Sequence, residues 1–75
     1  MIVTVYSTRQ CPACIVLKKW LDTNKIEYNS IIVGEDISPQ EFTDTTNSMG
    51  VPVTIVDGVQ VDGFNQAELG KLLKL

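Results

Sequence analysis

The sequence contains no histidine and only two cysteines among its 75 residues. A structural zinc site needs about four nitrogen or sulfur ligands. One chain of this composition cannot complete such a coordination sphere without carboxylates. We therefore expect no metal site in this chain.

Long apolar runs and a positive charge balance are also missing. No stretch approaches the ~18 consecutive apolar residues of a membrane helix. The N-terminus opens on a strand-like run and lacks the basic region of a signal peptide. The net charge is −3, and the six Lys and Arg residues are spread along the chain instead of forming the basic patch typical of nucleic-acid binding. From this composition we expect a cytoplasmic protein. We also expect that it binds neither a membrane nor a nucleic acid.

The residues that are present suffice for one small folded domain spanning residues 1–75. The hydrophobic fraction, 44%, is that of an ordinary globular protein. Hydrophobic periodicity and turn residues place the expected elements along the chain. In order, these are a strand over Ile2 to Tyr6, a helix over 12–23, a strand over 27–33, a helix from Pro39 to residues 48–50, strands over 53–56 and 59–61, and a helix after Asn65.

Capping and turn signals support these boundaries. Ser38 precedes Pro39 and lies three residues before Glu41, and Asn65 lies three residues before Glu68, as in helix N-terminal capping boxes. Asn24 is expected to end the first helix in a left-handed conformation. Asp57-Gly58 between two short apolar runs is a strong hairpin signal.

The second helix is expected to carry Phe42, Thr45, Thr46 and Met49 on one side. The resulting βαβαββα order predicts a four-stranded mixed sheet with its three helices divided between the two faces. Its first two strands are parallel, because a right-handed helical crossover joins them.

A Cys-Pro-Ala-Cys tetrapeptide, Cys11 to Cys14, lies between the first strand and the first helix. Free backbone N–H groups and the helix dipole at this point favour a thiolate. Pro12 suits the first helical turn, where its missing N–H costs nothing. The motif therefore indicates a dithiol–disulfide redox site.

Two other interpretations of the motif are possible. A purely structural disulfide would close a very short loop and constrain the unfolded chain little. Two unconnected cysteines would not explain the strand–turn–helix context. Redox chemistry accounts best for the pattern.

Taken together, these motifs resemble the thioredoxin superfamily, and within it the glutaredoxins and glutaredoxin-like redoxins of the NrdH type. The resemblance covers nearly the whole chain. It is carried by Tyr6-Ser7, the Cys-Pro-Ala-Cys motif, Gly50-Val51-Pro52-Val53, Asp57-Gly58 and Gly63-Phe64. It implies a thioredoxin-like fold with a cis-proline at Pro52, beside the cysteines.

The resemblance also implies a thiol–disulfide oxidoreductase without a cofactor, acting as a monomer on protein disulfides. Cys11 would be the exposed nucleophile, and Cys14, one helical turn inward, the more buried resolving thiol. The reduction potential would lie at about −200 to −270 mV. The implied substrate-binding residues are Tyr6, Arg9, Pro12, Val51, Pro52, Gly63, Phe64 and Asn65.

Three positions depart from the glutaredoxin pattern. Ala13 replaces a usual Tyr, and Thr8 and Asn65 stand where many glutaredoxins place a basic and an acidic residue for glutathione. Arg9 is a candidate substitute for the basic residue. The Gly63-Phe64 pair is more similar to NrdH-type redoxins, which reduce ribonucleotide reductase and are recharged by thioredoxin reductase. We therefore expect thioredoxin reductase to be the better electron donor, with glutathione as the alternative co-substrate.

Two functions of other classes compete with this interpretation. Some glutaredoxins scaffold an iron–sulfur cluster between two chains, which requires about four thiolates and hence outside ligands such as glutathione. The second alternative is an interaction domain whose cysteines are incidental.

Overall fold

The computed structural model covers residues 1–75, and its elements follow the predicted βαβαββα order. The bounds are β1 Val3–Ser7, α1 Pro12–Thr23, β2 Asn29–Ile32, α2 Pro39–Thr46, β3 Val53–Val56, β4 Val59–Asp62 and α3 Gln66–Leu73. None of the three helices is long and apolar enough to cross a membrane.

The strands form one mixed sheet in the order β2-β1-β3-β4. β1 is parallel to β2 and antiparallel to β3, and β3 and β4 form an antiparallel hairpin. At the tip of this hairpin Asp57 and Gly58 have φ values of 48° and 87°. Two successive positive φ angles match the right-handed twist of paired strands. The predicted fold class and hairpin are therefore confirmed.

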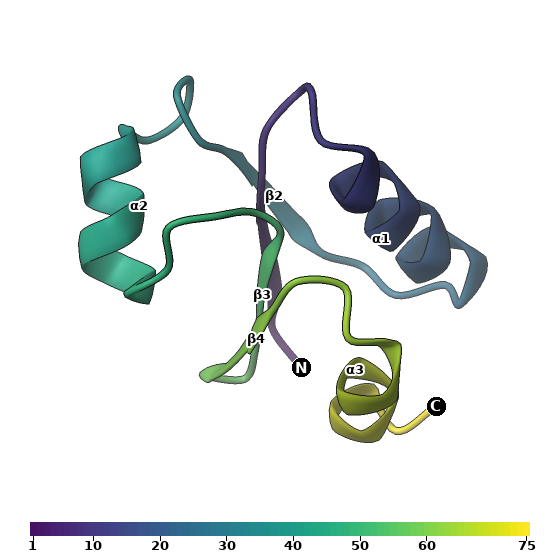
Figure 1. The fold of residues 1–75 in the computed structure, drawn as a ribbon. Coiled ribbons are helices and arrows are strands. Elements are labelled where there is room, and N and C mark those ends of the chain that lie inside the picture. The colour runs from purple at the N-terminus through teal and green to yellow at the C-terminus, as the bar shows by residue number, and fades with distance from the viewer.

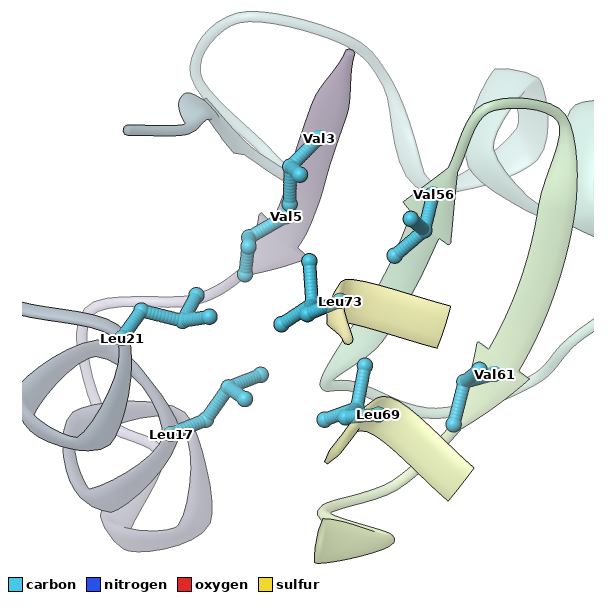
Figure 2. Packing of buried hydrophobic residues seen from close by; sticks show 8 residues of the cluster. All are labelled: Val3, Val5, Leu17, Leu21, Val56, Val61, Leu69 and Leu73. Atoms are coloured by element: carbon cyan, nitrogen blue, oxygen red, sulfur yellow. The ribbon is translucent and has the colours of Figure 1, made fainter. Parts of the chain in front are cut away.

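The helices lie in two layers, with α1 and α3 on one face of the sheet and α2 on the other (Figure 1). The larger core lies between the sheet and the α1–α3 layer, where leucines of both helices meet valines of three strands (Figure 2). Its buried members are Val3, Val5, Leu17, Leu21, Val56, Val61, Leu69 and Leu73. A smaller cluster beneath α2 contains Tyr6, Phe42 and Val53.

Residues on β1 alternate between these two cores, because successive side chains of a strand point to opposite faces. Val5 packs in the α1–α3 core, while Tyr6 packs beneath α2 with its ring centroid 5.5 Å from that of Phe42. By the same alternation Ser7 faces α1, at the end of the strand that leads into the Cys-Pro-Ala-Cys motif. The turn between β1 and α1 thus starts from a fully buried position.

The end of α1 differs from the prediction for Asn24. Asn24 has φ −89°, and the left-handed residue is Lys25, with φ 59°. The N–H of Lys25 donates to the carbonyl of Asp22, and the N–H of Ile26 donates to that of Leu21. This is a Schellman motif, in which the left-handed residue follows the C-cap, so the chain reverses one residue later than expected.

The second helix is shorter than predicted. It ends at Thr46, because Asn47 adopts the left-handed conformation with φ 55°. Phe42 and Thr46 are buried as expected, but Thr45 is exposed and Met49 is 95% exposed beyond the helix end. Placing Thr45 and Met49 on the inner face was therefore wrong. The first strand is displaced by one residue, to Val3–Ser7, and the second is shorter than the predicted 27–33.

Candidate functional site

The two cysteines form a disulfide at the start of α1. Their Cα atoms are 5.2 Å apart, within the range that a disulfide requires. Cys11 is the N-cap residue, with extended backbone angles, and is partly exposed. Cys14 lies one turn into the helix and is 1% exposed. The two sulfurs therefore differ in their access to solvent.

The helix terminus is directed at the sulfur of Cys11. The backbone N–H of Cys14 donates to Cys11 Sγ at 3.2 Å, so a free N–H of the first turn is already aimed at this atom. Pro12 takes the first helical position, and no acidic residue lies in the first turn. The positive end of the helix dipole is therefore not offset locally, and it stabilises negative charge on the sulfur.

The loop before β3 lies across from Cys11. The carbonyl oxygen of Val51 is 4.0 Å from Cys11 Sγ, and the Val51–Pro52 peptide bond is cis. The N–H of Gly63 donates to the carbonyl of Pro52 at 2.8 Å, which ties this loop to the end of β4. Gly63 has φ 69°, a left-handed conformation that favours glycine. The start of α1 and the loop before β3 thus meet at Cys11, and the turn after β4 holds that loop in place.

The two residues after Gly63 are engaged within the protein. The ring of Phe64 is half-buried and meets the indole of Trp20 edge-on, with ring centroids 5.8 Å apart. Asn65 is the N-cap of α3, and its side-chain oxygen accepts from the N–H of Glu68 at 3.1 Å. The predicted cap is confirmed, and the amide oxygen of Asn65 is already occupied.

Arg9 forms an ion pair with Glu35, across a separation of 26 residues. Nη2 of Arg9 donates to Oε1 of Glu35 at 3.0 Å, and Nε of Arg9 donates to Oε2. This two-pronged contact with the guanidinium lowers the pKa of the Glu35 carboxyl and raises the pKa of Arg9. The pair joins the turn before Cys11 to the loop that follows β2.

The remaining predicted site residue, Tyr6, is buried in the sheet, so its side chain offers little surface to a substrate. Its side chain is 9% exposed and belongs to the cluster beneath α2. Exposed apolar side chains instead follow the cysteines along α1. Ile15 and Val16 are 53% and 51% exposed, although a packed helix normally turns such residues inward.

Three residues at or near the site escaped the sequence analysis. Glu35 gave no signal, because its partner is remote in the chain. Ser7 and Thr54 are fully buried, and neither hydroxyl has a hydrogen-bond partner. Ser7 lies at the end of β1, and Thr54 lies opposite Val5 in the sheet. The sequence analysis ended the first strand before Ser7 and placed Thr54 within the strand over 53–56, but it gave no sign that either hydroxyl is buried and unpaired.

The thioredoxin-like fold and the Cys11–Cys14 pair define this protein as a thiol–disulfide oxidoreductase. The sequence model of the glutaredoxin family matches residues 3–61, and the chain belongs to that family. The thiol–disulfide chemistry of this family uses no prosthetic cofactor.

Individual relatives agree with this assignment. The chain is 38% identical over 74 residues to the glutaredoxin-like protein NrdH of Lactococcus lactis, with 95% of this chain and 99% of the relative covered. It is 34% identical over 74 residues to an uncharacterized glutaredoxin-like protein in the rubredoxin operon of Clostridium pasteurianum, with 97% and 99% covered.

Solved structures show the same fold. A mutant of the thioredoxin-like protein BC3987 superimposes with a TM-score of 0.89 at 29% identity, and the match covers 96% of this chain and 94% of that one. The glutaredoxin from Archaeoglobus fulgidus superimposes with a TM-score of 0.82 at 20% identity, and the match covers 97% of this chain and 86% of that one. The predicted resemblance to glutaredoxins and NrdH-type redoxins is confirmed.

Proposed function

We propose that this oxidoreductase carries electrons to protein disulfides, with Cys11 as the nucleophile and Cys14 as the resolving thiol. The observation that carries the assignment is the contrast between the two sulfurs. Cys11 is partly exposed at the helix terminus, whereas Cys14 is 1% exposed. A nucleophile must reach a partner in solution, while a resolving thiol needs to reach only the neighbouring sulfur.

The reaction proceeds in two exchanges. The Cys11 thiolate attacks one sulfur of the target disulfide, and the other target sulfur leaves as a thiolate. Cys14 then gives its proton to solvent and attacks Cys11 Sγ, which releases the second target thiolate. Two electrons have passed to the target, and the Cys11–Cys14 disulfide is the product.

A protein partner is supported by the surroundings of Cys11. Pro12, Ala13, Ile15 and Val16 present apolar atoms on the exposed side of α1, and such a patch favours burial against another protein. The Val51 backbone, with its carbonyl 4.0 Å from Cys11 Sγ, is placed to pair with an extended segment of the partner. Ribonucleotide reductase, the target that similarity to NrdH-type redoxins implies, is the candidate substrate.

The electron donor in this proposal is thioredoxin reductase, in preference to glutathione. Glutathione carries one ammonium and two carboxylates, which need oppositely charged partners. Asn65 is neutral and caps α3, Thr8 is neutral, and Arg9 is paired with Glu35. Each missing charged hydrogen bond costs about 1.5–3 kcal/mol, so two weaken binding by roughly 10² or more.

A coupled NADPH assay tests this choice. One reaction contains thioredoxin reductase, and the other contains glutathione with its reductase, each with a disulfide-bonded protein substrate. We expect the higher kcat/KM with thioredoxin reductase. A higher kcat/KM with glutathione would replace the proposed donor and make the chain a glutathione-dependent glutaredoxin.

A cytoplasmic, monomeric protein fits this role. A cysteine pair that must return to the dithiol form needs a reducing compartment, and the cytosol provides one. Sedimentation of the reduced and oxidised forms checks the monomer, and cell fractionation checks the compartment.

A further inference from the structure

Arg9 and Glu35 form an ion pair between the turn that precedes Cys11 and the loop that follows β2. Arg9 lies two residues before Cys11, so their backbones are within about 7 Å. The Arg9 side chain adds several ångströms to this separation, so the charges of the pair lie within about one to two Debye lengths of Cys11, each ~8–10 Å at ordinary ionic strength. Their effect on a molecule that approaches Cys11 is therefore sensitive to salt.

The loop that carries Glu35 is held by its own hydrogen bonds. The N–H of Gly34 donates to the carbonyl of Ile37 at 2.7 Å, and the N–H of Glu35 donates to the carbonyl of Ile32 at 3.1 Å. Asp36 closes the turn, because its Oδ2 accepts from the N–H of Ile32 at 2.8 Å. The carboxylate of Glu35 is thus presented to Arg9 from an ordered turn.

The consequence for a charged reductant follows from the geometry. The planar guanidinium is the nearest cationic group to Cys11 along the chain, and Glu35 occupies two of its donors. An anionic thiol must displace Glu35 from Arg9, or approach a pair whose opposite charges largely cancel and which therefore offers it no attraction. A neutral thiol does not depend on that attraction.

We propose that Glu35 is a specificity-determining residue that, by holding Arg9, slows the reaction of small anionic thiols such as glutathione at Cys11. This inference rests on the proposed preference for a protein reductase. The disfavoured reaction is attack by a glutathione thiolate on Cys11 Sγ, with Cys14 leaving as a thiolate. A second glutathione thiolate then releases Cys11 and forms glutathione disulfide, so two electrons enter the protein.

The test measures the second-order rate at which three thiols reduce the Cys11–Cys14 disulfide, at matched thiolate concentrations. The thiols are cysteamine, 2-mercaptoethanol and glutathione, which are cationic, neutral and anionic. In Glu35→Gln we expect the glutathione rate, divided by the 2-mercaptoethanol rate, to rise about three- to fivefold over wild type. Cysteamine should gain nothing, and 0.5 M KCl should reduce the increase.

Glu27→Gln is the matched control, because Glu27 is exposed, forms no ion pair and carries the same charge. It should change the ratio less than twofold. In Glu35→Gln/Arg9→Gln the gain should disappear, because the released guanidinium is its source, and a gain that persists would overturn the proposal. A ratio in Glu35→Gln equal to that of Glu27→Gln, or an equal acceleration by all three thiols, would overturn the proposal.

Failure of the donor assignment is recognised separately. If thioredoxin reductase does not reduce the wild-type protein, the proposed donor is wrong. The charge-dependent ratio still decides the role of Glu35, since it compares thiols on the same disulfide without any reductase.

Discussion

The backbone N–H of Cys14 donates to the sulfur of Cys11 at 3.2 Å, although Cys14 itself is almost fully buried. Cys14 thus donates a backbone hydrogen bond to the sulfur of Cys11, while the Cys14 side chain itself is shielded from solvent. The helix start therefore makes the two thiols chemically unequal, and in the proposed mechanism this inequality sets which sulfur attacks the target first.

Single cysteine variants test this inequality. Cys14→Ser should still attack a disulfide-bonded protein and then accumulate the mixed disulfide through Cys11, because the resolving step is missing. Cys11→Ser should form no adduct and should lose disulfide reduction completely. Mass spectrometry of the trapped species identifies the attacking sulfur. Stable adducts on Cys14 in Cys11→Ser, with none on Cys11 in the other variant, would reverse the two roles.

Two glycine substitutions should have opposite effects on stability. Gly63→Ala places a side chain at φ 69° and should lower the free energy of unfolding by about 1 kcal/mol or more. Gly70 lies within α3, where an added Cβ meets nothing within 4 Å. Gly70→Ala should therefore raise the free energy of unfolding by about 0.5–1 kcal/mol. Urea unfolding followed by Trp20 fluorescence measures both. The same sign for both variants would contradict the backbone argument.

Thr54→Val should stabilise the protein. Its hydroxyl is fully buried without a partner, between Val5 and Val61 in the sheet. A buried unpaired hydroxyl costs roughly 1–3 kcal/mol, and valine has nearly the same shape. We expect a gain of about 1 kcal/mol, seen as a rise in Tm of roughly 4–8 °C.

Thr45→Val is the control for this change, because Thr45 is exposed on α2. Its effect should stay within about 0.5 kcal/mol. A loss of stability in Thr54→Val would mean that the hydroxyl has a partner, such as a buried water molecule.

The ion pair of Arg9 and Glu35 predicts a pH dependence. The guanidinium lowers the pKa of Glu35 in the folded protein, so the pair stabilises the fold above the ordinary glutamate pKa. This contribution is lost as the pH falls through the lowered folded-state pKa of Glu35. The substitution Arg9→Gln should raise the pKa of the Glu35 carboxyl above its wild-type value. An NMR titration of that carboxyl in both proteins measures the change. An unchanged pKa would show that the contact does not persist in solution.

Local interactions between residues close in the sequence determine several features of this protein. The Cys-Pro-Ala-Cys motif, the caps at Ser38 and Asn65, and the Asp57-Gly58 turn each depend on residues within four positions of one another. Their physical signals therefore survive in the bare sequence, and together with the hydrophobic periodicity they gave the order of elements and the redox class.

The ends of α1 and α2 needed more than local signals. Asn24 and Asn47 are the same residue type at two helix ends, yet only Asn47 is left-handed. After Asn24 the reversal falls on Lys25, and the next residue, Ile26, packs against the α1–α3 core. The place at which a helix stops therefore depends on which following side chain the core can bury.

Contacts between remote segments were decided only by the tertiary structure. Glu35 meets Arg9, and the N–H of Gly63 reaches Pro52, because the sheet order brings the ends of their strands together. The approach of the loop around Pro52 to the cysteines was expected from the family resemblance alone. No periodicity or spacing in the sequence encodes such pairs. Their formation depends on how the packed layers close around the two cores, which is a property of the whole chain.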